Sequence, residues 1–202
     1  MLLATGCKKT NSRNTNAQDQ FPNTIGDKWD YLVKDTTFHQ GLPADTSSVQ
    51  YNVDVLIVNT VKLANGITAT IWQFKYPDHV DSNYIYQSED TIKIMDHTSL
   101  YLLGQYIFPF TSGSSWQYLP TITPFPESVT VTGPSVITVG NNEYSGAWRI
   151  YGFTGPPDGM FTIDDWFVDH VGFVKKYLNT GGEYTLATRH NLDWYLESYE
   201  LK

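Results

Sequence analysis

The chain has 202 residues, of which 17% are charged and 15% are aromatic, and it carries 14 tyrosines and a formal net charge of −8. Its 13 Lys and Arg residues are scattered, which excludes the clustered positive charge that binding to nucleic acid requires. Few charges and many aromatic residues are typical of a chain rich in β-strands, and the length suffices for one domain with a sizeable core.

The N-terminal segment contains the only cysteine of the chain, Cys7, so an intramolecular disulfide is impossible. Residues 3–7 read LATGC, which resembles the lipobox that ends a bacterial lipoprotein signal peptide. This resemblance implies that residues 1–6 are the remnant of a signal peptide and that Cys7 carries a lipid anchor. The alternative is a free cysteine in a disordered tail.

The stretch that follows, residues 8–20, reads KKTNSRNTNAQDQ and contains Ala17 as its only apolar residue. Such a composition is typical of a flexible tether. We therefore expect a lipidated cysteine and tether over residues 7–20, followed by a single β domain over residues 21–202. The partner at the N-terminus would be a membrane, reached through the lipid.

Strand patterns begin after the tether, and the clearest is a hairpin over residues 49–77. Apolar residues alternate with polar ones from Val49 to Ile57, Asn65-Gly66 is a strong turn signal, and a second alternating run follows from Ile67 to Tyr76. Further strands are predicted over residues 83–87, 91–95, 99–108, 128–132, 135–139, 143–153, 171–178, 183–190 and 192–199, with turns at Gly and Pro between them. Residues 162–171 could also form a helix, but the β-branched residues favour a strand through Trp166, Phe167 and Val168.

These strands predict an all-β domain, an antiparallel meander that forms a curved sheet, half-barrel or sandwich. One phrase occurs twice: residues 21–31 read FPNTIGDKWDY and residues 108–118 read FPFTSGSSWQY, with six of eleven positions identical. In each copy the glycine permits a tight turn before a strand that opens with tryptophan. We expect Trp29 and Trp116 to be buried at the starts of strands; a construction from two similar halves and a coincidence of turn chemistry both stay open.

With these phrases, the strand of residues 143–150 (EYSGAWRI) and residues 166–175 (WFVDHVGFVK), the chain resembles a family of uncharacterised secreted lipoproteins of Bacteroidetes. The resemblance spans nearly all of residues 21–202 and implies an antiparallel β domain, curved like the half-barrels of periplasmic lipoprotein carriers, with no implied activity. It also implies a place in the bacterial cell envelope. Lys8 and Lys9 stand where surface-exported lipoproteins of these bacteria have an acidic cluster, which favours an outer membrane anchor facing the periplasm.

A ligand-binding surface is suggested by aromatic side chains on the predicted hairpin. Residues 67, 69 and 71 supply one apolar face, and Trp72, Phe74 and Tyr76 occupy the opposite one, which on a one-sided sheet would face water. A second sheet or a ligand must cover it, and in the first case most of these rings belong to the core. We predict a concave groove for an apolar or glycan ligand, built from Trp72, Phe74, Tyr76, Tyr84 and Tyr86.

Catalytic signatures are weak. The acid pairs at residues 89–90 and 164–165 resemble glycosidase carboxylates, but neighbours on a strand point to opposite faces. Histidine spacing predicts no metal, and no glycine loop predicts a nucleotide or another cofactor. We therefore expect non-catalytic binding of a ligand or partner. The alternative is a small hydrolase or glycan-acting enzyme, which should gather two of five acids in one cleft: Glu89, Asp90, Asp164, Asp165 and Asp169.

Overall fold

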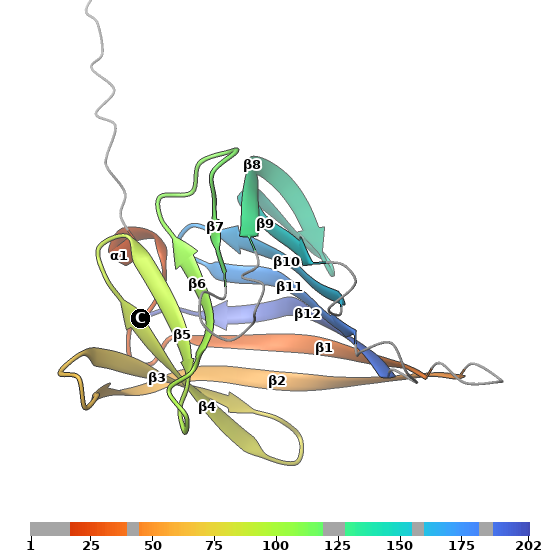
Figure 1. Cartoon of the computed structure of the whole chain (residues 1–202), viewed down its shortest axis with the longest axis horizontal. Coiled ribbons are helices and arrows are strands. Elements are labelled where there is room, and N and C mark those ends of the chain that lie inside the picture. Colours follow the sequence, from red (N-terminus) through yellow and green to blue (C-terminus); the bar gives the residue numbers. More distant parts are fainter. Residues whose placement is uncertain (1–16, 40–44, 119–127, 155–159, 182–187) are drawn as a thin grey trace, which may run out of the picture.

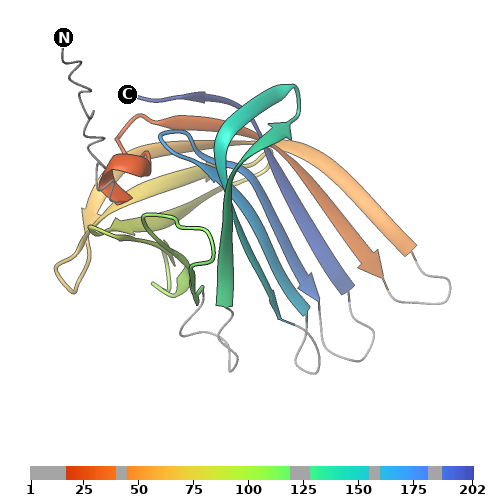
Figure 2. The same ribbon diagram turned by 90° about the horizontal axis from the view of Figure 1, so that it is seen from above.

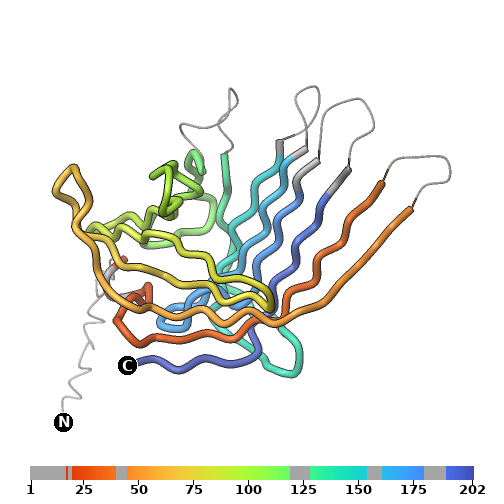
Figure 3. Tube along the Cα trace, turned by 90° about the horizontal axis from the view of Figure 1, so that it is seen from below, coloured from red at the N-terminus to blue at the C-terminus, as the bar shows by residue number. Residues whose placement is uncertain are grey.

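The chain is described by a computed structural model over residues 17–39, 45–118, 128–154, 160–181 and 188–202. Twelve strands form one antiparallel sheet in the order β6-β5-β4-β3-β2-β1-β12-β11-β10-β9-β8-β7. Figure 1 and Figure 3 show that this sheet curls strongly around a common interior. The prediction of an all-β antiparallel meander is confirmed, and the curvature brings the sheet close to a closed barrel.

The sheet consists of two meanders of six strands each, joined where β1 pairs with β12. The first meander contains β1 (Lys28–His39), β2 (Asp45–Lys62), β3 (Thr68–Lys75), β4 (Val80–Gln87), β5 (Thr91–Asp96) and β6 (Leu102–Ile107). The second contains β7 (Ser115–Gln117), β8 (Ser128–Val139), β9 (Asn142–Thr154), β10 (Met160–Val168), β11 (Gly172–Gly181) and β12 (Thr188–Glu200). The edge strands β6 and β7 meet through the amide of Gln105, which donates to the carbonyl oxygen of Tyr118 at 3.2 Å.

Two predicted breaks are wrong. Gly133-Pro134 was expected to be a turn, but β8 continues through it with a register shift, because Gly133 adopts a φ of 128° that other residues avoid. A side chain at Gly133 would also place its Cβ 2.8 Å from the carbonyl oxygen of Ala147. The predicted gap at residue 191 is absent too, because Asn191 pairs with both Thr36 of β1 and Asn179 of β11. The strand expected through Trp166 is present as β10.

The last four residues of the predicted tether form the short helix α1 (Ala17–Gln20) against the sheet. The amide of Ala17 donates to the carbonyl oxygen of Glu89 at 2.9 Å, and the Gln87 side chain donates to the carbonyl oxygen of Ala17 at 2.8 Å. On the other meander, the amide of His170 donates to Gln20 at 2.9 Å. These three contacts hold α1 at the end where β12 finishes (Figure 2). Cys7 and residues 8–16 lie outside the described part of the chain.

The first copy of the repeated phrase forms a tight turn that fixes the start of β1. The amide of Asp27 donates to the carbonyl oxygen of Thr24 at 3.0 Å, with Gly26 at a φ of 96°. Gly26 and Asp27 then exchange hydrogen bonds with Ile57 of β2, at 2.9 and 3.1 Å. The positive φ explains why glycine stands at this position.

The second copy forms the same turn before β7. The amide of Ser114 donates to the carbonyl oxygen of Thr111 at 3.0 Å, and Gly113 has a φ of 87°. Gly113 and Ser114 exchange hydrogen bonds with Val131 of β8, each at 2.9 Å. The recurring residues therefore specify the same local structure twice.

The tryptophans of the two copies are buried at the starts of their strands, as predicted, with exposed fractions of 1% for Trp29 and 9% for Trp116. The indole of Trp29 donates to the carbonyl oxygen of Val171, between β10 and β11, at 2.7 Å. The indole of Trp116 donates to the carbonyl oxygen of Gln105 on β6 at 2.8 Å. Each tryptophan therefore bonds to the meander that does not contain it.

Replacing Trp29 or Trp116 by Ala should lower the free energy of unfolding by about 3 to 5 kcal/mol, because each change removes a buried ring and a hydrogen bond between the meanders. Tyr101 is 65% exposed, so Tyr101→Ala is the control and should change stability by less than about 0.5 kcal/mol. Denaturant unfolding monitored by circular dichroism measures all three. A loss at either tryptophan no larger than that at Tyr101 would contradict the structural role.

Candidate functional site

The curled sheet encloses a cavity of about 280 Å³ on its concave side. Its base is aromatic: the ring of Phe21, which follows α1, stacks on Trp72 of β3 at 5.4 Å between centroids. Trp72 also stacks on Trp29 at 4.8 Å. Phe21 stacks on Phe167 of β10 at 6.1 Å as well. One end of the barrel is thus closed by rings from both meanders.

Three of the five predicted ligand-binding residues line the cavity, namely Trp72, Phe74 and Tyr76. They occupy alternate positions, so one face of the β3 segment points inward. Trp194 of β12, which the sequence analysis did not single out, meets Phe74 at 6.4 Å and Tyr76 at 6.3 Å, both edge to face. The inner wall is therefore a continuous aromatic surface across β3 and β12.

Tyr84 and Tyr86 are not among the residues that line the cavity. Ile85, which lies between them on β4, lines it and is buried. Because neighbouring residues of a strand face opposite sides, both tyrosines project from the outer face, where Tyr84 contacts His97 at 6.5 Å between ring centroids. The structure thus separates the predicted set into three inner and two outer residues.

A charged pair lies in this mainly apolar wall. Asp165 of β10 stands opposite Lys176 of β11, given the register from Ile163↔Leu178 to Trp166↔Lys175. The Lys176 ammonium donates to Oδ2 of Asp165 at 2.8 Å. The Asp165 side chain is only 2% exposed, whereas that of Lys176 is 30% exposed. Both residues line the cavity, and the ammonium is the more accessible partner.

Two tyrosines complete this buried cluster. The hydroxyl of Tyr106 on β6 donates to Oδ2 of Asp165 at 2.6 Å and accepts from Lys176 at 3.0 Å. Since its hydrogen is directed to Asp165, the hydroxyl of Tyr118, 2.9 Å away, is the donor in the contact between the two tyrosines. A Cβ at Gly104 would lie 2.5 Å from the Tyr118 hydroxyl oxygen. Glycine at that position therefore leaves the space that the Tyr118 hydroxyl needs.

Burial raises the pKa of two tyrosines, Tyr106 and Tyr31, above the ordinary value. Desolvation, followed by the nearby Asp165 carboxylate, raises the pKa of Tyr106 well above its ordinary value. Desolvation also raises the pKa of Tyr31 on β1, whose hydroxyl donates to the carbonyl oxygen of Phe173 at 2.7 Å. Both groups act as neutral hydrogen-bond donors at physiological pH.

The five acids considered for catalysis do not meet in the cavity, since Asp165 is the only one of them that lines it. Asp164 faces the other way and forms a bidentate ion pair with Arg149 of β9, at 2.7 and 2.8 Å. Glu89 and Asp90 are exposed in the turn between β4 and β5, and Asp169 accepts a hydrogen bond from Gln20 at 3.1 Å.

One further carboxylate lines the cavity, that of Asp81. It lies at the start of β4, 3.5 Å from the ring nitrogen of His97, and its side chain is half-exposed.

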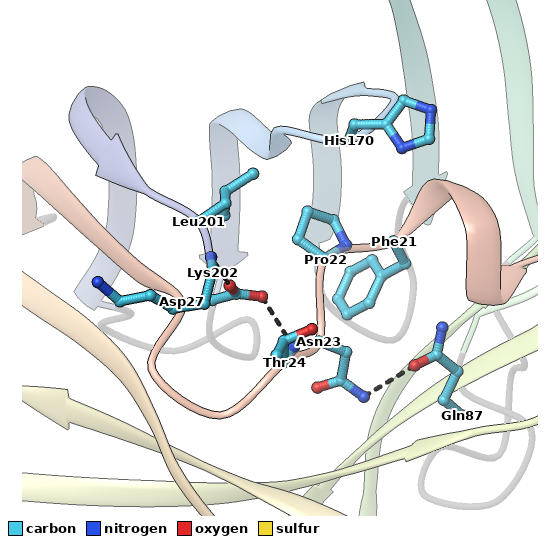
Figure 4. A pocket seen from close by; sticks show the side chains of 9 residues that line it. All are labelled: Phe21, Pro22, Asn23, Thr24, Asp27, Gln87, His170, Leu201 and Lys202. Atoms are coloured by element: carbon cyan, nitrogen blue, oxygen red, sulfur yellow. Dashed lines mark hydrogen bonds between the residues drawn. The ribbon is translucent and has the colours of Figure 1, made fainter.

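A second pocket, of about 260 Å³, lies at the α1 end of the barrel (Figure 4). Asp27 is buried there and accepts from the amides of Thr24 at 2.8 Å and Lys202 at 2.9 Å. Asn23 donates to Gln87 at 2.9 Å and accepts from the indole of Trp72 at 2.8 Å. These polar groups are hydrogen-bonded to one another. The pocket therefore marks the place where residues 21–31 and the C-terminus are attached to the sheet.

The charged pair could have been found from the sequence by one signal. Asp165 is flanked on its own face by Ile163 and Phe167, and Lys176 has Leu178 as its neighbour on one side. A single ionisable residue on an otherwise apolar strand face indicates a buried partner of opposite charge. The two faces could be matched only once β10 and β11 were known to pair.

Across the described residues, no group of three or more His, Cys, Asp or Glu side chains is arranged to hold a metal ion. Within the same part of the chain, none of the helices has the length and hydropathy needed to cross a membrane.

No protein-family model matches this chain, and no curated protein sequence does. A crystal structure of MucB in complex with MucA(peri) aligns with 7% identity over 87% of this chain and 89% of that chain, at a TM-score of 0.17. The complex of Pseudomonas aeruginosa MucA and MucB aligns with 6% identity over 89% and 94%, at a TM-score of 0.16. Similarity at this level carries no argument about function.

Stability should fall at alkaline pH because of the buried phenols. An unfolded tyrosine ionises near pH 10, whereas burial raises the pKa of Tyr31 above that value. The folded state then binds more protons above pH 10, so the contribution of Tyr31 to stability is complete below pH 10 and declines as the pH rises. Tyr31→Phe should make this decline shallower by about 1.4 kcal/mol per pH unit.

Urea unfolding between pH 9 and the onset of alkaline denaturation measures this slope. Tyr101→Phe is the matched control, because Tyr101 is 65% exposed, and should leave the slope unchanged. Equal slopes for the two variants would show that Tyr31 is not the proton-linked group.

Proposed function

We propose that this protein binds a small apolar ligand, without catalysis, in the cavity inside the curled sheet. The observation that carries the proposal is the cavity itself, about 280 Å³ and lined by Trp72, Phe74, Tyr76 and Trp194. This volume is close to the lower limit of about 300 Å³ for ligand pockets, and aromatic side chains are typical of their walls.

Stability alone would favour filling such a space. An empty apolar cavity costs about 24 cal/mol for each Å³, so larger side chains at its wall would stabilise the fold. Leu178 and Leu192 line the cavity and are only half-buried. A ligand that covers them would recover the hydrophobic contribution that the free protein lacks.

A binding role also fits the arrangement of acids. Glycoside hydrolysis needs two carboxyl groups flanking one bond, and the single inner acid of the predicted five, Asp165, is already bound by Lys176 and Tyr106. The other carboxylate that lines the cavity, that of Asp81, lies on β4 and contacts His97 at 3.5 Å. The cavity therefore supports binding better than hydrolysis.

We further propose that the protein acts in the bacterial cell envelope, attached to the outer membrane on the periplasmic side through lipid on Cys7. Two features support this: the LATGC sequence of residues 3–7 and the polar stretch of residues 8–16. The resemblance of the repeated phrases and of residues 166–175 to secreted Bacteroidetes lipoproteins supports it as well. Two acyl chains would give stable attachment where one would be marginal.

Filling the cavity should weaken the binding of an apolar ligand. Leu178→Trp places a large ring into the space and should weaken binding of the apolar fluorescent probe N-phenylnaphthylamine at least about tenfold, equivalent to about 1.4 kcal/mol. Val136→Trp is the matched control, because Val136 is 60% exposed on β8 and does not line the cavity. Titrations followed by probe fluorescence measure both, and equal affinities would place the probe elsewhere.

Lipid attachment is tested by expressing the full-length gene in a bacterium that processes lipoproteins. The native protein should sediment with the membrane fraction, whereas Cys7→Ser should remain in the soluble fraction because it cannot be acylated. Metabolic labelling with an alkyne fatty acid provides the second readout. Identical partition and labelling of the two forms would refute the anchor.

A further inference from the structure

The charged pair in the cavity wall has one hydrogen-bond donor to spare. An ammonium group has three N–H donors, and within the described residues that of Lys176 uses one on Asp165 and one on Tyr106. The third can serve a ligand, since Lys176 lines the cavity with 30% of its side chain exposed. Its nitrogen also lies 4.1 Å from the ring centre of Phe173, so the donor is set in apolar surroundings.

The charge of this donor is already balanced. Asp165, 2.8 Å from the ammonium, neutralises it inside the wall. Among the described residues, Asp81 is the other charged one that lines the cavity, so the formal charges of Asp81, Asp165 and Lys176 sum to −1. A ligand carboxylate would add a second negative charge beside one ammonium, and in surroundings of low polarity such a charge is strongly disfavoured.

A ligand ammonium group beside Lys176 is also poorly matched, because it would meet a like charge and find Asp165 already paired. The other carboxylate of the wall, that of Asp81, is 50% exposed and already lies 3.5 Å from the ring nitrogen of His97. A neutral oxygen meets neither objection. It accepts the spare hydrogen bond from Lys176 without changing the charge of the wall, and a bond from a charged donor is about twice as strong as a neutral one.

We propose that the cavity selects an uncharged amphiphile, an apolar body with one hydrogen-bond-accepting oxygen such as an alcohol, ester or ketone, whose oxygen is bound by Lys176. This inference rests on the proposed binding function and specifies its ligand class. Asp165 is then the residue that sets the selectivity, because it removes the attraction that Lys176 would otherwise exert on a carboxylate.

The test compares three competitors that share one alkyl chain: lauryl alcohol, laurate and laurylamine. Each displaces N-phenylnaphthylamine from the full-length protein at neutral pH, where laurate is an anion and laurylamine a cation. Lauryl alcohol should bind at least about tenfold more tightly than either ion, a difference of about 1.4 kcal/mol. Methyl laurate, a second neutral acceptor, should follow the alcohol.

Asp165→Asn makes the test specific to the charge balance. Asn is isosteric and its amide oxygen can still accept from Tyr106 and Lys176, so circular dichroism should show an unchanged fold. Laurate should then gain at least about tenfold relative to lauryl alcohol, because the ammonium is no longer neutralised. The double variant Asp165→Asn/Lys176→Met removes both charges and should show no such gain.

The outcomes separate the two levels of the proposal. Failure of N-phenylnaphthylamine to bind the native protein overturns both the binding function and the ligand class. Probe binding with laurate or laurylamine equal to or better than lauryl alcohol leaves the binding function standing and overturns the ligand class. An unchanged laurate ratio in folded Asp165→Asn also overturns it, and if that variant does not fold, the ratios of the native protein decide.

Discussion

The structure depends on the number of strands that share one interior. About eight strands close around a space that their own side chains can fill, and wider barrels need something more. Twelve strands curl around the interior here, and the ring stack of Phe21, Trp72 and Phe167 fills one end of it. The part of the interior that these rings leave unfilled is the cavity. The fold therefore accounts for both the densely packed base and the open space beside it.

Placing a carboxylate in that wall requires hydrogen-bond donors around it, since an ion buried without partners costs several kcal/mol. Asp165 accepts from Lys176 and Tyr106, and Tyr118 contacts Tyr106; the two tyrosines come from the two edge regions of the sheet. The cluster thus ties β10 and β11 to the strands on either side of the seam between β6 and β7. The cluster therefore contributes to closure of the barrel, in addition to the ligand selection proposed above.

Much of the fold could be predicted from the sequence, because alternation and turn residues are local signals. They located the hairpin of β2 and β3, the strand through Trp166 and the burial of Trp29 and Trp116. The inward face of a strand is not a local property. Trp72 and Tyr84 both lie on alternating aromatic strands, yet only Trp72 points inward, because the direction of curling decides which face is concave.

For the same reason the charged pair could not be assigned from spacing, as Asp165 and Lys176 become partners only through the register of β10 with β11. The helix α1 was missed on different grounds. Its position is held by the amide of Ala17, which donates to Glu89, and by two side chains whose partners are distant in the sequence: Gln87 donates to Ala17 and Gln20 donates to Asp169. Composition described the segment correctly as polar but carried no information on these contacts.

The repeated phrase has a structural explanation in the two seams of the barrel. A sheet made of two meanders closes only if β1 meets β12 and β6 meets β7, and each copy of the phrase stands at one seam. In each copy the glycine turn fixes the strand against its hairpin neighbour, and the tryptophan then bonds across the seam, Trp29 to Val171 and Trp116 to Gln105.

The tyrosines of the phrase follow the same rule: Tyr31 donates to Phe173 in the second meander, and Tyr118 meets Tyr106 in the first. The two copies are thus reciprocal, each reaching into the half that contains the other. Closing a barrel from two similar meanders requires the same kind of contact at both seams. Glycine, tryptophan and tyrosine at fixed spacing form that contact in each copy of the phrase. Because the same contact is needed at both seams, the recurrence of the phrase has a physical reason, whether or not the two halves share an origin.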